Sequence, residues 1–179
     1  KLILFFQILQ QFINPISFKS ITHRQVVTNL FDTDSELAVN HVAMAEAADC
    51  IIVAPATANT IAKISHGISN DPLGTTILAT AAPVIIAPAM DGKMFENPAT
   101  QENLAILIQR GFFVCGPEFG RMASGLIGLG RLSATQDIIQ VASMILGQNS
   151  DYSQKKIVIT AGGTQEDLDP VRTITNRSS

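Results

Sequence analysis

Charged residues, cysteines and long apolar runs are all scarce in this sequence, and each shortage excludes a class of protein. Charged residues make up 15% of the chain and the net charge is −3, so the electrostatics do not favour nucleic acid or an anionic membrane as a partner. The two cysteines, Cys50 and Cys115, form no paired pattern, which favours a reduced, cytoplasmic compartment over a disulfide framework. No stretch approaches the run of about 20 apolar residues that spans a bilayer.

Hydrophobic residues, by contrast, make up 46% of the 179 residues. A chain of this length forms about one domain and buries roughly 70% of the surface that it exposes when unfolded. Because few charged side chains remain to solvate the surface, the composition favours a protein that buries part of itself against copies of itself.

The first six residues, Lys-Leu-Ile-Leu-Phe-Phe, have three interpretations. A basic residue before an apolar run imitates the start of a signal peptide, but the positive region is a single lysine and no small-residue cleavage site follows. We favour a buried strand or helix here, and an irregular amino terminus is the third interpretation.

Three short runs rich in Ile and Val predict buried parallel strands, at residues 50–54, 83–87 and 112–115. Each run is short and lacks the alternation of a strand with one wet face. Ligands of parallel sheets bind at the carboxyl ends of the strands. The three loops that follow, at residues 55–60, 88–91 and 116–118, each contain proline, and we expect them to form one composite site.

Helices are predicted around these strands, at residues 35–47, 60–65, 98–110 and 135–146. Strands that alternate with helices are typical of an α/β fold. We therefore expect a doubly wound (Rossmann-like, flavodoxin-like) parallel sheet in three layers, α/β/α.

Three features could carry chemistry, and by themselves they leave the alternatives open. His41 lies in a predicted helix, where a histidine serves a structural or a catalytic role. The loop at residues 55–60 offers hydroxyl and amide groups at a helix start, which suit either a ligand or an ordinary helix cap. The stretch at residues 120–131 holds four glycines and cannot keep a regular element without help, so it is either a mobile flap or a plain surface loop.

Five segments in a fixed order carry a resemblance to a known family. They are His-Val-Ala-Met from His41, Pro-Ala-Thr-Ala-Asn-Thr from Pro55, Pro-Ala-Met-Asp-Gly-Lys-Met-Phe from Pro88, the glycine-rich stretch from Ala123, and the run from residue 159 to Ser179. Together they resemble the homo-oligomeric flavin-containing cysteine decarboxylases. Among these, the resemblance is to the bifunctional phosphopantothenoylcysteine decarboxylases that continue into a phosphopantothenate–cysteine ligase domain.

The resemblance implies FMN-dependent decarboxylation of 4′-phospho-N-pantothenoylcysteine to 4′-phosphopantetheine in coenzyme A biosynthesis. The cysteinyl group is oxidised by FMN, CO₂ leaves, and the resulting enethiolate is reduced and protonated. The implied partners are FMN, the small-molecule substrate and further copies of the chain in a trimer or a multiple of trimers, without metal, nucleic acid or membrane. The alternative is a non-catalytic flavin-fold subunit with an oligomeric or regulatory role.

The resemblance also assigns roles to individual residues. The implied catalytic residues are His41, Asp91 and Ser124. Those implied to bind substrate are Pro88, Met90, Met94, Ala123, Gly125 and Arg131. Those implied to bind the cofactor are Pro55, Ala56, Thr57, Ala58, Asn59 and Thr60. The remnant of a ligase motif comprises Gly162, Gly163, Thr164, Asp169, Arg172 and Asn176.

The domain organisation follows from the same segments. Residues 1–147 are expected to form the decarboxylase domain, the polar residues 148–156 a linker, and residues 157–179 the start of a ligase domain. Because the nucleotide-binding body of a ligase does not follow, the chain is interpreted as a fragment without ligase activity.

Three departures from the family pattern stand out. Ser124 occupies the position where the family carries a cysteine that donates the final proton, and a hydroxyl is a far weaker acid than a thiol. Asp91 replaces an asparagine, which adds a negative charge where the substrate carboxylate is expected. A phosphate-binding Gly-Gly-Ile-Ala turn does not precede Phe12, so the first strand of the sheet is expected to be missing or altered.

Overall fold

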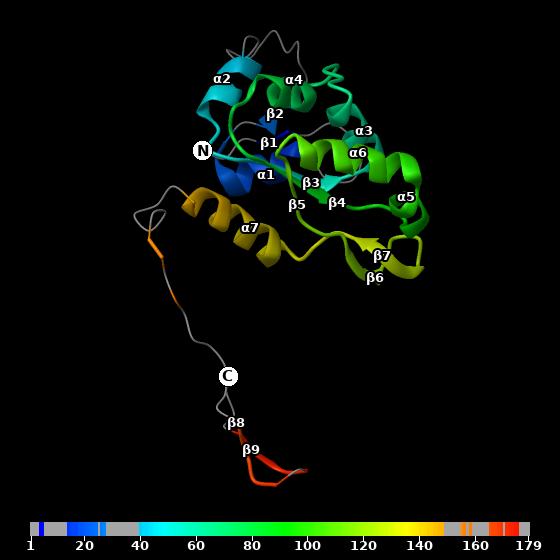
Figure 1. Cartoon of the computed structure of the whole chain (residues 1–179). Helices are drawn as coiled ribbons and strands as arrows, with labels where there is room; N and C mark the ends of the chain where they lie inside the picture. Colours follow the sequence, from blue (N-terminus) through cyan, green and yellow to red (C-terminus); the bar gives the residue numbers. More distant parts are fainter. Residues whose placement is uncertain are drawn as a thin grey trace. The chain divides into compact units, whose positions relative to one another are not determined.

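The structure is a computed structural model that describes residues 4–5, 14–24, 26–27, 40–148, 155–156, 158, 165–169 and 171–175. The chain divides into two compact units, Lys1–Gln148 and Asn149–Ser179, and each is described by itself (Figure 1). Among the described residues, none of the helices is long and apolar enough to cross a membrane.

A parallel sheet of three strands forms the centre of the first unit. Its strands are β3 (Ile51–Ala56), β4 (Val84–Pro88) and β5 (Phe113–Val114), in the order β3-β4-β5. Ile52 is in register with Ile85, and Ile86 with Val114. The three predicted strands are therefore confirmed, with β3 and β4 each extending into the proline that follows.

One face of this sheet is covered by three helices, α3 (Ala58–Ser65), α4 (Pro72–Ala79) and α6 (Pro98–Gln109) (Figure 1). Their apolar side chains pack with alternate residues of β3 and β4, so that Ile61, Ile86 and Leu107 are fully buried. Helices α3 and α6 lie side by side, and α2 (Asn40–Ala47) packs on α4. Of the helix predicted at residues 35–47, the part before Asn40 lies outside the described residues.

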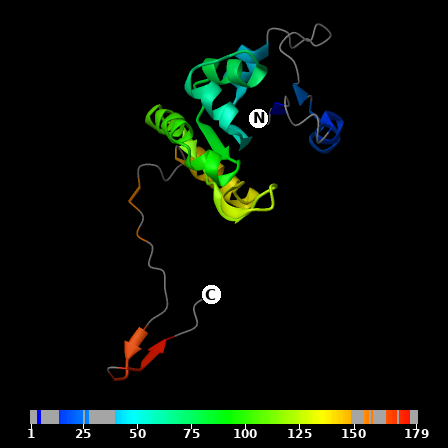
Figure 2. The same ribbon diagram turned by 90° about the vertical axis from the view of Figure 1, so that its right-hand side faces the viewer.

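The opposite face of the sheet is covered by α7 (Thr135–Gly147), seen beyond the sheet from α6 in Figure 1 and again in the turned view of Figure 2. Ile138 and Ile145 of this helix are buried against Ile85, Ala87 and Cys115. The two cores on either side of one sheet confirm the predicted three layers, α/β/α.

The glycine-rich stretch forms an antiparallel hairpin of β6 (Glu118–Arg121) and β7 (Ile127–Arg131). The stretch was expected to be a mobile flap or a plain surface loop, and the hairpin was not predicted. Gly130 lies so close to the Met90 backbone that its lack of a side chain permits the hairpin to lie against the rest of the unit, and Gly120 and Gly128 lie beneath the side chains of Arg131 and Met122. Helix α4 and the short helix α5 (Gly92–Glu96) were not predicted either.

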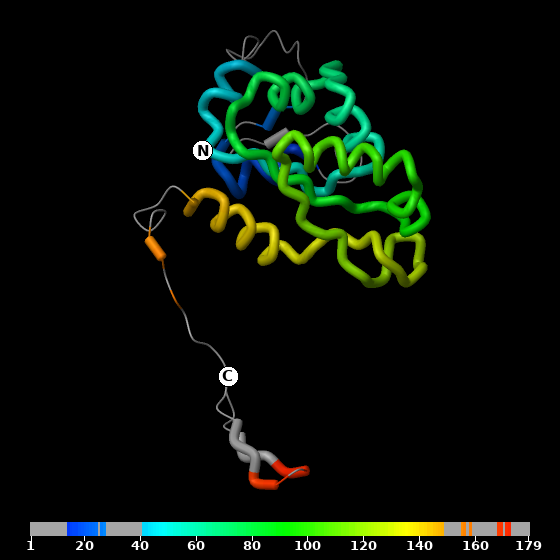
Figure 3. Tube along the Cα trace, in the orientation of Figure 1, coloured from blue at the N-terminus to red at the C-terminus, as the bar shows by residue number. Residues whose placement is uncertain are grey.

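The amino-terminal region contains β1 (Leu4–Phe5), α1 (Pro15–Thr22) and β2 (Val26–Val27). Strands β1 and β2 pair in parallel as a two-stranded sheet of their own, and Figure 3 traces α1 and β2 in blue. The strand at Leu4–Phe5 agrees with the favoured interpretation of the first residues. In the second unit, β8 (Gln165–Asp167) and β9 (Thr173–Thr175) form an antiparallel hairpin. Most of the strand predicted at residues 156–160 lies outside the described residues.

Candidate functional site

The loop at the end of β4 turns directly into helix α5, and Asp91 is the residue that caps this helix. The Asp91 Oδ1 atom accepts a hydrogen bond from the Lys93 backbone N–H at 3.1 Å. An aspartate at this position satisfies one of the helix amides that lack an intrahelical partner, and its negative charge favours the helix start. The side chain of Asp91 is therefore held in place by the backbone that follows it.

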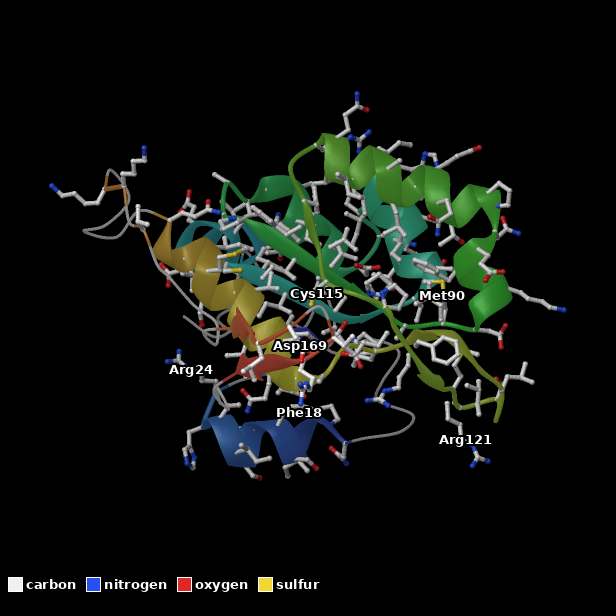
Figure 4. All side chains as sticks on the ribbon, turned by 60° about the horizontal axis from the view of Figure 1, so that its bottom comes forward. Phe18, Arg24, Met90, Cys115, Arg121 and Asp169 are labelled. Atoms are coloured by element: carbon white, nitrogen blue, oxygen red, sulfur yellow. The ribbon has the colours of Figure 1, made fainter. Side chains whose placement is uncertain are left out.

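The hairpin β6–β7 lies against this loop through backbone contacts. The Met90 N–H donates to the Gly130 carbonyl oxygen at 3.0 Å. Gly130 has a φ of 151°, and a β-carbon built on it would lie 2.2 Å from the Met90 carbonyl oxygen. Glycine is therefore required at this position, because a side chain would force β7 away from the end of β4. Figure 4 labels Met90 beside the hairpin.

The turn of the hairpin brings Ser124 to Asp91. The Ser124 Oγ donates to the Asp91 Oδ2 atom at 3.2 Å, so the two carboxylate oxygens of Asp91 serve two different partners. Gly125, next to Ser124, has a φ of 86° and closes the turn through a bond from its N–H to the Met122 carbonyl oxygen. Ala123, Ser124 and Gly125 are all exposed.

At the base of the hairpin, two charged side chains join its strands. Arg131 pairs with Glu118 across the two strands at 3.6 Å, and the other Glu118 oxygen accepts the Ala134 N–H at 2.7 Å where α7 begins. Ala134 is the residue before the first turn of α7 and its side chain cannot cap the helix. Glu118 therefore acts in place of a capping side chain and joins the hairpin to the start of α7. Its other oxygen pairs with the guanidinium of Arg131.

The loop after β3 lies beside the loop after β4. The Ala89 N–H donates to the Ala56 carbonyl oxygen at 3.0 Å, and Ala56 is fully buried. Thr57 caps α3, since its Oγ1 accepts the Thr60 N–H at 3.3 Å and lies 3.1 Å from the Thr60 Oγ1. Pro55 and Ala58 are half-buried in the same loop, where Asn59 is exposed.

The loop after β5 reaches the base of the hairpin. The Cys115 N–H donates to the Ile86 carbonyl oxygen at 2.9 Å, which extends the sheet by one residue beyond β5. A β-carbon built on Gly116 would lie 2.1 Å from the Oγ of Ser133, which is buried. The ends of β3 and β4 are thus joined by the bond between Ala89 and Ala56. The loop after β4 is joined to the hairpin by the bond between Met90 and Gly130, and the loop after β5 leads into that hairpin.

His41 lies elsewhere in the first unit. It is half-buried on α2, which packs on α4, and Figures 1 and 2 both draw α2 at the opposite end of the unit from the hairpin. Within one chain, the structure therefore brings Asp91 and Ser124 together but does not bring His41 to them. Met94 is 51% exposed on α5, and Pro88 is fully buried at the end of β4.

Cys50 and Cys115 are both free thiols of the first unit. Burial raises the pKa of the Cys50 thiol, so this residue stays protonated at neutral pH. Cys115 is buried in the core beneath α7.

The described part of the segment that was predicted to be a ligase motif contains an ion pair within one turn. Asp169 Oδ1 accepts the N–H groups of Val171 and Arg172, both at 2.9 Å, and Oδ2 accepts the Arg172 Nε at 2.6 Å. The two backbone N–H groups and the guanidinium lower the pKa of the Asp169 carboxyl, with the Val171 N–H as the largest cause. Gly162, Gly163, Thr164 and Asn176 lie outside the described residues.

Two residues of this site were not predicted from the sequence. Glu118 was noted as part of a loop, but its pairing with Arg131 depends on the register of a hairpin that was not predicted. Met122 packs on the glycines of the hairpin and of α5. The signal that could have revealed both is the alternation of side chains and glycines on each side of the turn.

Comparison with known proteins places these features in a family. Residues 6–147 match the family described as "Flavoprotein", and residues 152–179 match "DNA/pantothenate metabolism flavoprotein C-terminal domain". Since the first match covers most of the chain, the protein belongs to the flavoprotein family.

Curated relatives of high similarity are bacterial. The chain is 40% identical over 171 residues to the coenzyme A biosynthesis bifunctional protein CoaBC of Bacillus subtilis (strain 168), which is 94% of this chain and 42% of that protein. It is 43% identical over 170 residues to CoaBC of Vibrio cholerae, with 95% and 42% covered. The chain therefore spans about two fifths of the length of these relatives.

Solved structures share the fold. The FMN-dependent cysteine decarboxylase SpaF has a TM-score of 0.64 at 31% identity, covering 78% of this chain and 73% of its own. A PPC decarboxylase, as a cysteine-to-serine mutant complexed with pantothenoylaminoethenethiol, has a TM-score of 0.62 at 28% identity, covering 67% and 69%. The peptidyl-cysteine decarboxylase EpiD has a TM-score of 0.61 at 26% identity, covering 73% and 75%. These likenesses confirm the predicted flavodoxin-like α/β fold.

Proposed function

We propose that this chain carries an FMN-dependent decarboxylase of 4′-phospho-N-pantothenoylcysteine that acts in coenzyme A biosynthesis. The observation that carries the proposal is the contact between Ser124 and Asp91 at the joined ends of β3 and β4. These are the strand ends where parallel sheets bind ligands. The likeness to CoaBC proteins and to FMN-dependent cysteine decarboxylases supports the choice of reaction.

The loop at residues 55–60 suits a flavin. It is made of small residues, and it opens helix α3, whose first amides, Thr60 apart, have no acceptor within the helix. Thr57, Asn59 and Thr60 add hydroxyl and amide groups. FMN bound there supplies the oxidation of the cysteinyl group and the later return of electrons.

The side chains of the chain itself would then divide the remaining work. Asp91 and Ser124 face the cysteinyl end of the substrate, with the carboxylate of Asp91 fixed by the Lys93 N–H and the Ser124 hydroxyl. Repulsion between Asp91 and the substrate carboxylate favours the departure of CO₂. His41 acts as base or orienting group in the oxidation step.

We propose further that the working form is a trimer or a multiple of trimers. His41 is at the opposite end of the unit from Asp91 and Ser124, so a site that uses all three takes its residues from different copies. Exposed apolar side chains support such association, since Val42, Ile52, Phe119 and Ile127 are 44%, 43%, 72% and 71% exposed. Sedimentation of the purified protein tests this, and a soluble monomer would contradict it.

Visible absorbance tests the enzymatic function directly. The purified chain should be yellow, and its absorbance near the flavin maximum should bleach when 4′-phospho-N-pantothenoylcysteine is added without oxygen. Because the enethiolate later takes the electrons back from the flavin, the bleaching should be transient and the CO₂ released should finally exceed the flavin present. A yellow protein that neither bleaches nor releases CO₂ would contradict the reaction while leaving flavin binding intact.

A second function, a non-catalytic flavin-binding or regulatory subunit, is favoured by one observation. The hydrogen of the Ser124 hydroxyl points to Asp91, so it is not offered to a substrate. One structural neighbour is named only "The FMN binding protein AtHal3" (28% identity, TM-score 0.58, covering 67% of this chain and 68% of its own). The bleaching experiment separates the two functions.

We propose that the second unit opens a ligase domain after a linker at residues 148–156, and that the chain works in the cytoplasm. The match of residues 152–179 to a pantothenate-metabolism domain supports the assignment of the second unit. The chain by itself should not join phosphopantothenate to cysteine with CTP, and ligation by the purified chain would contradict the proposal.

A further inference from the structure

The side chain of Met122 lies over a floor made of three glycines. A β-carbon built on Gly130 would lie 3.0 Å from the Met122 Sδ, and one built on Gly128 would lie 3.5 Å from its Cε. A β-carbon on Gly92, in the first turn of α5, would lie 3.9 Å from the same Cε. Met122 therefore packs on both partners, the strand β7 and the helix that Asp91 caps.

The backbone of Met122 also fixes the turn that carries Ser124. Its N–H donates to the Leu126 carbonyl oxygen, and its own carbonyl oxygen accepts the Gly125 N–H, both at 2.9 Å. Ser124 is two residues away within this closed turn. A shift of the Met122 backbone away from the glycine floor would therefore carry the Ser124 hydroxyl away from the carboxylate of Asp91.

On the face of the hairpin that carries Met122, the other residues of β6 contribute little apolar packing. Alternation along β6 places Phe119 and Arg121 on one face and Gly120 and Met122 on the other. Phe119 is 72% exposed, and Figure 4 draws Arg121 projecting outward at the edge of the molecule. The face of the hairpin that meets α5 carries glycines, which have no side chains to pack. The packing of this face on α5 therefore depends on the side chain of Met122.

We propose that Met122 is a positioning residue, which seats the hairpin on α5 and so holds Ser124 against Asp91. A flexible thioether suits this place, because it fills the shallow space above three glycines that a branched side chain would not match. The consequence for turnover rests on the proposed function, whereas the seating of the hairpin does not. The role is distinct from catalysis, since Met122 acts through Ser124 and Asp91.

Amide hydrogen exchange in the full chain tests the seating without any turnover. The Met90 N–H, bonded to Gly130, reports the contact of β7, and the Lys93 N–H, bonded to Asp91, reports the orientation of that carboxylate. Met122→Ala should speed exchange at both amides by about tenfold, and Met122→Leu should restore most of the protection. Met144→Ala, at a methionine that is 58% exposed on α7, is the matched control and should change neither.

A double-mutant cycle then separates positioning from general stability. In a Ser124→Ala background, Met122→Ala should leave the Lys93 exchange rate and the rate of phosphopantetheine formation almost unchanged, because the contact that it supports is already absent. Unchanged exchange at Met90 and Lys93 in the single Met122→Ala protein would overturn the proposal. So would an equal effect of Met122→Ala with and without Ser124. A protein that shows the exchange coupling but no turnover would keep the positioning role and refute the decarboxylase.

Discussion

The Ser124 hydroxyl donates a hydrogen bond to the Asp91 carboxylate across 3.2 Å, and it thereby joins the turn of a hairpin to the first turn of a helix. Both residues differ from what the family pattern led us to expect, which was cysteine and asparagine. A carboxylate only accepts hydrogen bonds, so the serine must be the donor, and a thiol would donate more weakly. Serine at position 124 and aspartate at position 91 therefore form a hydrogen-bond donor and acceptor that suit each other.

Ser124→Cys should speed phosphopantetheine formation by about 10²–10⁴-fold, since it introduces an acid positioned to protonate the enethiolate. Oxidation and CO₂ release precede that proton transfer, so their single-turnover rates should stay unchanged. Rapid-quench measurement of both products checks this. If the parent already forms reduced product as fast as CO₂, the idea that serine slows the last step is wrong.

His41→Asn should abolish substrate-dependent flavin reduction while the sedimentation coefficient stays the same. Flavin reduction should be lost because asparagine cannot act as the base. The sedimentation coefficient should stay the same because His41 is half-buried at the surface of α2, where an amide of similar size can be accommodated. Anaerobic stopped-flow absorbance measures the effect. Reduction at near the parent rate would remove His41 from the mechanism.

Asp91→Ala should lower the free energy of unfolding by about 0.5–2 kcal/mol, because the cap of α5 is lost. Asp91→Asn should cost less, since its amide oxygen can still accept the Lys93 N–H. Urea denaturation gives the values, and Asn97→Ala, which removes the cap of α6, is the control. Trypsin cleavage after Arg121 should accelerate in Asp91→Ala and not in Asn97→Ala. Equal cleavage in both would show that Asp91 does not hold the hairpin.

Gly130→Ala should destabilise the first unit by about 2 kcal/mol or more, because the new methyl group would overlap the Met90 carbonyl oxygen at a φ that L-residues rarely adopt. Gly147→Ala, at the end of α7 with open space around it, should be neutral or stabilise by up to about 1 kcal/mol. Thermal unfolding of the two variants compares them. A tolerated Gly130→Ala would mean that β7 does not lie against the end of β4.

Asp169 should make the turn between β8 and β9 sensitive to acid. Its pKa is lowered in the folded turn, so ionised Asp169 stabilises the turn above the ordinary carboxyl pKa of about 3.9. That contribution is lost as the pH falls through the lower pKa of the folded form, and it does not change between neutral pH and about 5. The amide chemical shifts of Val171 and Arg172 should follow this transition. In Asp169→Asn the transition should be absent, and its persistence would assign the titration to another group.

Local patterns were enough to predict the strands β3, β4 and β5 and the helices α3, α6 and α7. Runs of Ile and Val mark β3 and β4; the central strand β4 is buried on both faces, whereas β3 exposes Ile52. Gly111, with a φ of 87°, follows the end of α6. Helix α4 was missed because Gly74, Thr75 and Thr76 are poor helix formers. It is held by Asp71, whose Oδ1 accepts the Gly74 N–H at 2.7 Å and whose Oδ2 pairs with Lys63 at 3.1 Å.

The sequence by itself determined that Asp91 and Ser124 follow strand ends or glycine-rich turns, and that their neighbours match one family. It could not determine that the two side chains meet, because they are 33 residues apart and the contact depends on how a hairpin lies on a helix. Glycines allow that arrangement, since a methyl group on Gly130 would overlap the Met90 carbonyl oxygen and one on Gly92 would press on the Leu129 carbonyl oxygen. Close approach of backbone to backbone leaves no periodic signal in a sequence, so only the tertiary structure decided it.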